Sequence, residues 1–593
     1  MVQKGKPAVL GKAEWGSDVI VDMLRALDYE YIALNPGATF RGLHDSLVNY
    51  GGNTAPETIL CTHEEIAVAI AHGYAVATGR PMAAAVHNIV GLLHASMGIF
   101  NAWEDRMPVL VLGGTGPMAT EQRRPWIDWI HTALVQGNAV RDFVKWDDQP
   151  ASVQGFIDSL LRAQQILTTE PRGPVYINFD AALQELKLDQ PLPIPDVARY
   201  AAHSRVQGDP EAMQRAADLL AGARRPVILA NSLGGSPEAI ASLVALAERL
   251  PAPVIDMGSL YNFPSTHPLN LTGAATEILK DADVILALDV LDLQQALSTL
   301  DRATRMATSS VPESAQIIDI SLRQFKVRSW VQDFGRIYPT DVPISADCAI
   351  AVPTLVELCL KKVDDLPDRV EARRQRAAAL QERHAEIRNA ASEAVDKTAD
   401  QSPISVPFMV QQVWEAARSY DWTVTDSVRS NWVGRLWDIT KPEQYLVSPG
   451  GGGVGGSIGR ALGIALAYKG TGKLPIQFQG DGDLMMAPGA LWTAARHRIP
   501  ALYVINNNRS YYNDEDHQGM IAKTRGRPEE NKHIAIRLED PNADFASLAR
   551  SLGVHGEGPI ERPEDLGPAL ARAARVVVEE GRPAVVDVIA QNR

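Results

Sequence analysis

Residues 474–508 read LPIQFQGDGDLMMAPGALWTAARHRIPALYVINNN, and this stretch decides the fold class of the chain. Residues 476–479 predict a strand, residues 487–498 predict a helix that Pro500 ends, and the apolar residues 501–505 predict a second strand. A strand, a helix and a strand in this order form a βαβ unit, in which the two strands are parallel. The carboxyl ends of both strands therefore lie at the same edge of a sheet.

Polar residues follow each of these two strands. Asp481 stands in a Gly-Asp-Gly turn after the first, and Asn508 closes a cluster of three asparagines after the second. We expect both side chains in the crevice where parallel sheets bind ligands. A carboxylate, an amide oxygen and a nearby backbone carbonyl suit Mg²⁺ that holds a diphosphate. A lone Gly-Asp-Gly is also an ordinary turn, and asparagines are common in loops, but the order and spacing together favour a metal site.

Composition sets limits on the class of protein. The chain has 593 residues, 46% apolar and 22% charged, which fits a soluble globular protein of three large domains. It has no apolar run of about eighteen residues, so we expect no membrane span. The net charge of −14 argues against nucleic acid as a partner. Three scattered cysteines, with no signal-peptide core in the first residues, predict a cytoplasmic protein.

Strand and helix patterns alternate in three blocks, which predicts an α/β protein of three doubly wound parallel-sheet domains. The first domain is expected over residues 13–188, and a proline-rich linker over 189–209. The middle, Rossmann-like domain is expected over 210–361. An exposed, charged helical linker over 362–402 then leads to the third domain, 403–593.

A glycine-rich segment precedes the opening motif by one strand. Residues 448–459 read SPGGGGVGGSIG and lead into a helix through Tyr468. Glycines let the backbone approach a ligand closely and adopt positive φ. A flexible loop is the plain alternative, but the position before a helix favours contact with a cofactor. Residues 426–431, which follow another predicted strand, can add polar groups to a diphosphate site.

The Gly-Asp-Gly turn followed by the asparagine cluster resembles the motif of thiamine-diphosphate-dependent enzymes. The resemblance implies two cofactors, thiamine diphosphate and Mg²⁺. It also implies three metal ligands and three neighbouring contacts to the cofactor: Asp481, Asn508 and the carbonyl of Ser510 for the metal, and Gly480, Gly482 and Asp483 for the cofactor.

That cofactor needs a carboxyl group at N1′ of its aminopyrimidine ring. Residues 61–75, CTHEEIAVAIAHGYA, resemble the segment that carries this group in thiamine-diphosphate decarboxylases and acetolactate synthases. The resemblance makes Glu64, nine residues before Gly73, the catalytic glutamate. A glutamate at a helix start also interacts favourably with the helix dipole, which is the role we expect of Glu65.

The order of pyrimidine, middle and diphosphate domains resembles the decarboxylase and acetolactate-synthase superfamily over nearly the whole chain. In that superfamily the cofactor lies between domains of two subunits, so a homodimer or homotetramer is expected. The resemblance implies that the carbonyl of Gly452 accepts from the 4′-amino group and that Val454 bends the cofactor. Relatives usually carry Leu, Met or Ile in place of Val454.

Three shorter stretches, residues 86–94, 144–146 and 490–495, resemble benzoylformate decarboxylase. His87 falls where that enzyme has an active-site histidine, which implies proton transfer to and from the substrate oxygen. A polar cap at a strand end is the alternative.

Two other positions depart from benzoylformate decarboxylase. The turn Asn35-Pro36-Gly37, expected to contact the cofactor, is kept, but Ala38 stands where that enzyme has a substrate-contacting serine. Asp289 lies in the segment where its second active-site histidine is expected.

Two further catalytic candidates rest on position. His131 lies in the loop after the third strand, where relatives place Gln or His. Trp126 and Trp129, beside it in sequence, can line an apolar pocket or belong to the core or to an interface. Asp514 follows Asn508 by six residues, where pyruvate decarboxylase-like enzymes carry a glutamate, although a solvated loop explains it equally well.

The resemblance implies a thiamine-diphosphate-dependent C–C bond lyase or carboligase, foremost a 2-oxo acid decarboxylase of the benzoylformate type. Its donor is a 2-oxo acid or related acyl compound, with an aldehyde or ketone as acceptor if it is a carboligase. The alternatives are an acetolactate-synthase-like carboligase, a non-catalytic homologue and a nucleotide-dependent oxidoreductase. The middle block lacks the GxGxxG fingerprint that the last of these needs.

Overall fold

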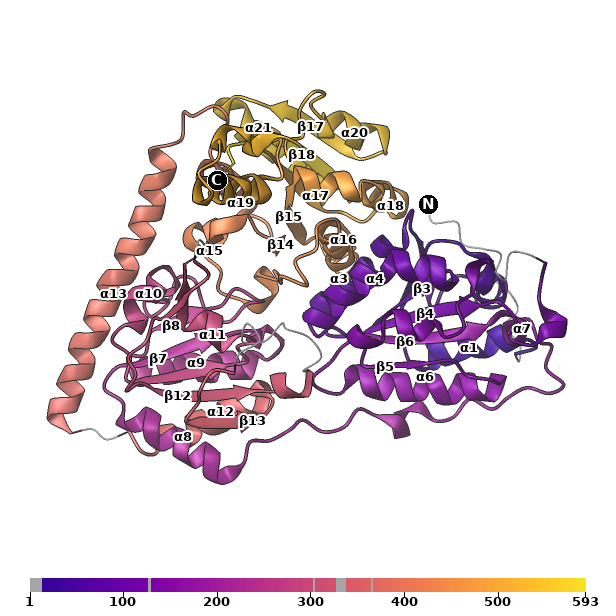
Figure 1. Ribbon diagram of the computed structural model, residues 1–593, viewed down its shortest axis with the longest axis horizontal. Coiled ribbons are helices and arrows are strands. Elements are labelled where there is room, and N and C mark those ends of the chain that lie inside the picture. The colour runs from indigo at the N-terminus through magenta and orange to yellow at the C-terminus, as the bar shows by residue number, and fades with distance from the viewer. Residues whose placement is uncertain (1–12, 126–129, 302–303, 327–336, 364–365, 593) are drawn as a thin grey trace.

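The computed structural model describes residues 13–125, 130–301, 304–326, 337–363 and 366–592. Three parallel β-sheets follow one another along the chain, and helices cover them on both faces (Figure 1). The predicted α/β architecture of three parallel-sheet domains is thereby confirmed. Within these described ranges, no helix combines the length and the apolar character needed to cross a membrane.

The first sheet has six parallel strands in the order β2-β1-β3-β4-β6-β5. Alternate residues of its strands face opposite cores, so that Ala33 and Ala84 face α3 and α4 while Ile32 and Ala83 face α1 and α6. The elements are β1 (Tyr31–Leu34), β2 (Glu57–Leu60), β3 (Met82–Val86), β4 (Val109–Thr115), β5 (Trp146–Asp148), β6 (Val175–Asp180), α1 (Gly16–Ala26), α2 (Arg41–Asp45), α3 (Glu64–Thr78), α4 (Asn88–Glu104), α6 (Val153–Thr168) and α7 (Ala181–Gln184).

The middle sheet has five parallel strands in the order β13-β12-β9-β7-β8. Ile228 and Leu286 face the core that the middle domain shares with the third domain, and Val227 and Ile285 face a smaller core of their own. The elements are β7 (Pro226–Ala230), β8 (Val254–Asp256), β9 (Val284–Leu288), β12 (Gln316–Ser321), β13 (Val342–Ser345), the antiparallel pair β10 (Ser298–Leu300) and β11 (Ala307–Ser309), α8 (Pro210–Gly222), α9 (Pro237–Arg249), α10 (Ala275–Leu279), α11 (Leu293–Ala296) and α12 (Cys348–Leu360).

The third sheet is parallel, in the order β14-β15-β16-β18-β17. Its elements are β14 (Trp422–Asp426), β15 (Leu474–Gly480), β16 (Leu502–Asn507), β17 (His555–Ile560), β18 (Ala584–Ile589), α14 (Val406–Ala417), α15 (Trp432–Leu436), α16 (Ser457–Ala467), α17 (Asp481–Met486), α18 (Gly489–His497), α19 (Tyr512–Thr524), α20 (Phe545–Ser551) and α21 (Pro563–Glu580).

The predicted βαβ unit is present, with one difference. The acidic turn is absent, because Asp481 itself begins α17 directly after β15. Acidic residues favour the first turn of a helix, so Asp481 and Asp483 suit this position. The helix expected over residues 487–498 is present as α18, and Pro488 separates it from the short helix α17 that replaces the turn.

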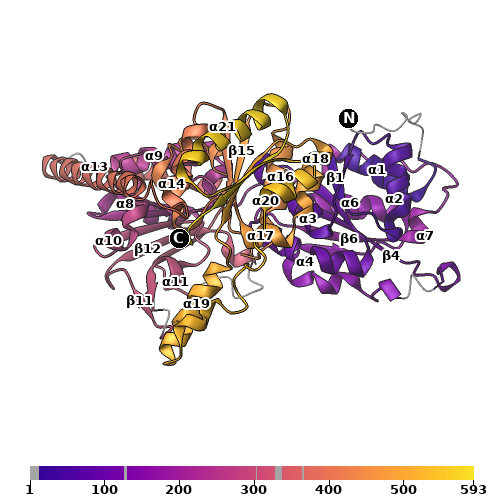
Figure 2. The same cartoon turned by 90° about the horizontal axis from the view of Figure 1, so that it is seen from above.

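Helix α13 (Pro367–Asp396) connects the middle and third domains and has 30 residues. Figures 1 and 2 show it as a long rod at the side of the molecule. Arg376 donates from Nε to the carbonyl of Pro251, at 2.8 Å, and Arg388 donates from Nη2 to Asp438, at 2.7 Å. The helix is therefore tied to both domains, in addition to presenting a charged face to solvent.

Helices α3 and α16 bring the first and third domains together, and both views show them side by side (Figures 1 and 2). A Cβ placed on Gly73 would lie 1.9 Å from the carbonyl oxygen of Arg460, and one on Gly463 would lie 2.0 Å from that of Ile70. Only glycine fits at such a crossing. The apolar residues of α3, α4, α16 and α18 consequently form one core that crosses the domain boundary.

We expect Gly463→Ala to lower the free energy of unfolding by about 1–3 kcal/mol, because the added methyl group has no room between the helices. Gly222→Ala in α8 is the matched control, since a Cβ there meets nothing within 4 Å. Urea titration followed by circular dichroism measures both variants. Equal stability of the two variants would contradict the close helix crossing.

Candidate active site

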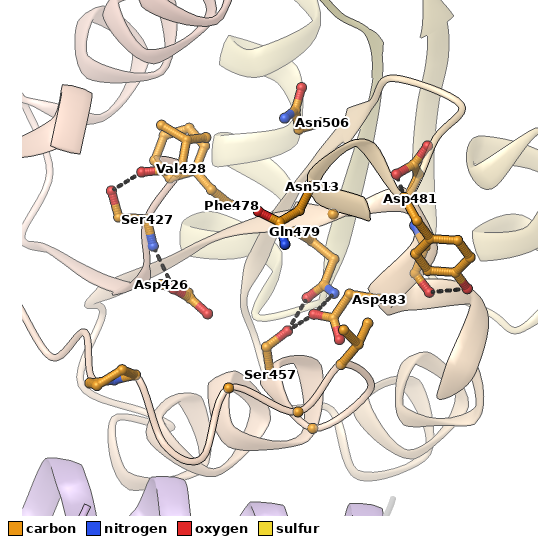
Figure 3. A pocket seen from close by; sticks show the side chains of 18 of the residues that line it. Asp426, Ser427, Val428, Ser457, Phe478, Gln479, Asp481, Asp483, Asn506 and Asn513 are labelled. Carbon is orange, nitrogen blue, oxygen red and sulfur yellow. Dashed lines mark hydrogen bonds between the residues drawn. The ribbon is translucent and has the colours of Figure 1, made fainter. Parts of the chain in front are cut away.

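A cavity of about 630 Å³ lies at the carboxyl edge of the third sheet (Figure 3). The segments after β14, β15 and β16 line it together with the glycine-rich loop, residues 448–456. Asp481 and Asn508 both line it, as the predicted βαβ unit requires. Residues Ala69, His72 and Asn101 of the first domain close its remaining wall.

Asp481 is the most deeply buried acid of this cavity, with 3% of its surface exposed. Its Oδ1 accepts from the backbone N–H of Gly482 at 2.8 Å, while its Oδ2 is buried without a hydrogen-bond partner in the described residues. Burial raises the pKa of Asp481 to about 6. A buried, unpartnered carboxylate oxygen is suited to a cation.

The three asparagines differ in their surroundings. Asn507 is buried and donates from Nδ2 to Asp587, at 3.0 Å, so it is part of the core. Asn506 and Asn508 line the cavity, and the Oδ1 of Asn506 is buried without a partner in the described structure. Asn508 accepts at Oδ1 from the N–H of Ser510, at 3.0 Å. Ser510 also lines the cavity, so the three expected metal ligands lie together.

The glycine-rich loop has the conformation that its glycines allow. Gly452 adopts a φ of 68°, and a Cβ there would meet open space, so the cavity reaches its backbone. Val454 lines the cavity and is 46% exposed. Gly456 and Ser457, at the start of α16, line it too, and the amino-terminal end of a helix favours anions.

Asp483 holds this loop in place (Figure 3). Its carboxylate accepts from the N–H of Gly455, from the hydroxyl of Ser457 and, at 2.6 Å, from Nε2 of Gln479. We predicted Asp483 as a contact to the cofactor. It lines the cavity as Gly480 and Gly482 do, but its two oxygens are engaged by the protein itself.

Helix α4 holds the opposite side of the loop, which the sequence did not lead us to expect. Asn101 accepts at Oδ1 from the N–H of Gly451, at 2.9 Å. Asp105, just after α4, accepts at Oδ1 from the N–H of Gly450, at 2.9 Å, and at Oδ2 from the hydroxyl of Ser448, at 2.6 Å. The available signal was the spacing of four between Asn101 and Asp105, which puts both on one face of a mostly apolar helix.

Asp105 belongs to a buried ionic network. Nε2 of His72 lies 2.9 Å from its Oδ2, and Arg460 donates from Nη1 to Ser448, at 3.0 Å. Burial alone would raise the pKa of Asp105, but the hydrogen bonds and charges of His72, Arg460 and Ser448 outweigh burial and hold that pKa below its ordinary value. The aspartate is therefore ionised, and its charge fixes the glycine-rich loop.

The start of α3 lies beside the same loop. A Cβ on Gly456 would be 3.6 Å from Oε1 of Glu65, an oxygen that is buried without a partner in the described residues. Burial raises the pKa of Glu65, and the carboxylate of Asp483 raises it further. Glu64 turns to the other side, where its Oε2 lies 3.1 Å from Nδ1 of His94. Glu65 thus has surroundings that a role at the helix dipole alone does not explain.

His87 and His131, predicted from separate segments, lie together. Nε2 of His87 is 3.3 Å from Nδ1 of His131, and Nδ1 of His87 is 3.0 Å from Oγ1 of Thr39. Burial lowers the pKa of His87, and the neighbouring imidazole of His131 lowers it further. Thr39, which we had not singled out, supplies a hydroxyl next to the position of Ala38.

The turn Asn35-Pro36-Gly37 packs against His87, since a Cβ on Gly37 would lie 2.4 Å from that of His87. Neither this turn nor Glu64, His87 and His131 is among the described residues that line the 630 Å³ cavity. The expected contact of residues 35–37 with the cofactor stays a prediction.

Asp289 has a structural partner instead of a catalytic neighbour. It accepts from both Nη1 and Nη2 of Arg106, the first at 2.8 Å. Lys326 of the middle domain donates to the carbonyl of Glu104, at 3.1 Å, and its Nζ lies 3.3 Å from Oε2 of that residue. The consecutive residues Glu104, Asp105 and Arg106 therefore join the first domain to both of the others.

Asp514 is exposed on α19 and lines the cavity, as a lid residue would. Its neighbour Glu515 is buried, accepts from Ser510 at 2.8 Å and pairs with Arg537 at 3.0 Å, which supports the Ser510 backbone. Trp126 and Trp129, predicted as pocket walls, lie outside the described residues.

Comparisons with known proteins agree with this architecture. Three sequence models of thiamine pyrophosphate enzymes match in order: the N-terminal TPP binding domain at residues 14–137, the central domain at 213–355 and the C-terminal TPP binding domain at 428–588. The chain belongs to the superfamily of thiamine-diphosphate-dependent enzymes.

Individual relatives are distant. The chain is 25% identical to a benzoylformate decarboxylase of Pseudomonas aeruginosa, over 90% of this chain and 92% of that protein. It is also 25% identical to a probable acetolactate synthase large subunit of Methanocaldococcus jannaschii, over 97% and 91%. The crystal structure of benzoylformate decarboxylase from Polynucleobacter necessarius superposes with a TM-score of 0.75 at 18% identity, covering 98% of this chain and 99% of that one, and shows the shared fold.

The cavity fits the cofactor that the family binds. The unpartnered oxygens of Asp481 and Asn506 are hard donors at one end, and the start of α16 offers backbone N–H groups to a diphosphate. The open space at Gly452 leaves room for a ring against the backbone.

We expect Asp105→Asn to weaken binding of thiamine diphosphate roughly 10-fold, because the loop loses a charged acceptor and His72 loses its buried partner. Quenching of tryptophan fluorescence on titration with the cofactor and Mg²⁺ measures the affinity. Asp158→Asn, at an exposed position of α6, serves as the control. Unchanged affinity in Asp105→Asn would show that α4 does not position the loop.

Proposed function

We propose that this thiamine-diphosphate-dependent enzyme uses Mg²⁺ and decarboxylates 2-oxo acids in the manner of benzoylformate decarboxylase. The observation that carries the proposal is the cavity in which Asp481 keeps a buried, unpartnered oxygen opposite the glycine-rich loop. The match of residues 86–94 to the benzoylformate-decarboxylase pattern, with His87 at its start, supports the reaction type.

Each part of the cavity has a proposed task. Asp481, Asn508 and the carbonyl of Ser510 would hold Mg²⁺, and the start of α16 would hold the diphosphate. The carbonyl of Gly452 would bind the aminopyrimidine, with Val454 between the two rings. The carboxyl of Glu64, which does not line this cavity of the single chain, would reach the aminopyrimidine across a subunit interface. In the single chain the start of α3 is already packed beside the glycine-rich loop, although the family arrangement places these groups on two subunits. We propose a homodimer or homotetramer in the cytoplasm.

The bound cofactor supplies a carbon nucleophile and an electron sink for cleavage next to a carbonyl group. The protein's residues position it and move protons. His87 has a lowered pKa and is neutral near pH 7, so it can accept a proton from the substrate and return it. Thr39 orients the His87 ring through Nδ1, and His131 contacts its other nitrogen.

The second candidate is an acetolactate-synthase-like carboligase, in which the acyl unit is transferred to an aldehyde or ketone. The probable acetolactate synthase of Methanocaldococcus jannaschii matches 97% of this chain. Its 25% identity equals that of the benzoylformate decarboxylase, so it supports the carboligase as strongly. Ala38 and Asp289 at positions where benzoylformate decarboxylase has a serine and a histidine also favour a different substrate.

We expect Glu64→Gln to slow exchange of the cofactor C2 hydrogen with solvent by about 100-fold or more, since an amide cannot hold the proton of a carboxyl group. Metal binding should persist, because Asp481 and Asn508 are unaltered. Glu65→Gln is the informative neighbour, since its side chain faces the loop and carries a raised pKa. If C2 hydrogen exchange stays fast in Glu64→Gln and becomes slow in Glu65→Gln, the catalytic carboxyl group is that of Glu65.

The reaction type is tested by incubating the holoenzyme with a panel of 2-oxo acids, with and without an aldehyde acceptor. Release of CO₂ with an aldehyde product identifies a decarboxylase, and an acyloin product identifies a carboligase. Removal of Mg²⁺ by a chelator should abolish either activity, and added Mg²⁺ should restore it. Turnover of no 2-oxo acid in the panel would contradict the proposed substrate class.

A further inference from the structure

A second cavity, of about 400 Å³, lies between the middle domain, helix α13 and the first part of the third domain. Asp256 at the end of β8 lines it from the middle domain, His384 and Arg388 line it from α13, and Arg435 lines it from α15. These three parts belong to one chain, so the cavity forms within a single subunit. Its size suits a small molecule.

This cavity differs from the crevice in which a Rossmann-like sheet usually holds a nucleotide. That crevice lies at the carboxyl ends of the strands where the strand order reverses, which here are β7 and β9. Asn231 follows β7 and donates from Nδ2 to the carbonyl of Asp289, at 3.2 Å, and Arg106 of the first domain pairs with the Asp289 carboxylate. The polar groups of that crevice are therefore engaged by the protein, whereas the second cavity lies at the edge strand β8.

Asp256 presents to this cavity a carboxylate that neutral groups hold. Its Oδ1 accepts from the N–H of Gly258 and from Nδ2 of Asn262, both at 2.8 Å. Burial raises the pKa of Asp256 to about 6, so the group is ionised at pH 8. It forms no ion pair with any residue that the structure describes. A partly buried carboxylate without a cationic partner favours a positively charged ligand group.

Arg435 is the positive counterpart on the opposite, third-domain side of the cavity. Its Cζ lies 5.2 Å from the centroid of the Trp432 ring, which positions the guanidinium. Among the described residues, no hydrogen bond or ion pair joins Arg435 to another side chain. A planar guanidinium of this kind binds a carboxylate through two parallel hydrogen bonds.

The other ionisable groups around the cavity add no further open charge. Arg388 donates to the carboxylate of Asp438, at 2.7 Å, so its charge is paired. Burial lowers the pKa of His384, which is therefore neutral at pH 8. Burial raises the pKa of Tyr261 and of Tyr445, so both remain neutral phenols. Asp256 and Arg435 are left as one negative and one positive group that face the same space.

We propose that this cavity binds a small zwitterion, with its ammonium group at Asp256 and its carboxylate at Arg435. These two described residues line one cavity and do not pair with each other, so a molecule that carries both charges can bridge them. Phe263, Ile387 and Ile439 also line the cavity and favour a short methylene chain between the charges. The inference goes beyond the proposed function and does not rest on it.

The experiment is isothermal titration calorimetry on the full chain at pH 8. Thiamine diphosphate and Mg²⁺ are present, because Ser430 lines both cavities and the first one must be occupied. The probes are the straight-chain amino carboxylates from glycine to 6-aminohexanoate, each compared with the plain carboxylate and the plain amine of equal length. We expect one chain length to bind about 10-fold or more tightly than both of its plain counterparts, because it alone pairs with both charges.

Two variants remove the charges one at a time. Asp256→Asn should reduce the affinity for the best amino carboxylate to that of the plain carboxylate, and Arg435→Gln should reduce it to that of the plain amine. Asp158→Asn in α6 and Arg215→Gln in α8, at exposed positions, are the matched controls and should keep wild-type affinity. Thermal unfolding checks that each variant is folded. If Asp256→Asn is unstable, Arg435→Gln decides, since Arg435 makes no hydrogen bond to the described residues.

Equal affinity for the amino carboxylate and the plain carboxylate at every length would overturn the proposal. Wild-type affinity in both Asp256→Asn and Arg435→Gln would also overturn it, because the zwitterion then binds elsewhere. Binding of adenosine diphosphate that Arg435→Gln weakens, without binding of any amino carboxylate, would show a nucleotide site instead. These titrations involve no turnover, so their outcome is independent of the reaction type.

Discussion

Helices α3 and α16 approach so closely that the backbone of one contacts the backbone of the other, and glycines at residues 73 and 463 make this possible. The crossing sets the position of both helix starts. Glu64 and Glu65 begin α3, and the glycine-rich loop ends at the start of α16. A side chain at either crossing point would move the start of α3, and with it Glu65, away from the glycine-rich loop. The candidate site therefore depends on a packing contact that contains no catalytic group.

Hydrogen bonds from two directions hold the glycine-rich loop in place. Asp483 holds it from within the third domain, and Asn101 and Asp105 hold it from the end of α4. The residues on either side of Asp105 bind the middle domain through Lys326 and Asp289. One short segment thus aligns the middle domain with the glycine-rich loop, which gives this domain a structural role although it lacks a nucleotide fingerprint.

The parts of the fold and site that lie within one βαβ unit were predictable. The strands on either side of residue 481 and the approach of Asp481 and Asn508 follow from hydrophobic pattern and from the geometry of parallel sheets. The start of a helix at Asp481 was missed, since a Gly-Asp-Gly sequence suits a turn equally well. Asn101, Asp105 and Thr39 were missed because their partners are 48 to 350 residues away in sequence.

The sequence by itself determined the three-domain order, the cofactor class and the residues at the carboxyl edge of the third sheet, because these follow from local periodicity and short motifs. Only the tertiary structure decided which residues share an environment. It separated Asn507 from Asn508, and paired His87 with His131 and Glu64 with His94. The physical reason is that burial and hydrogen bonding depend on chain crossings far apart in sequence. The motif around Asp481 thus gives only the outline of the candidate site, and its surroundings determine what it can do.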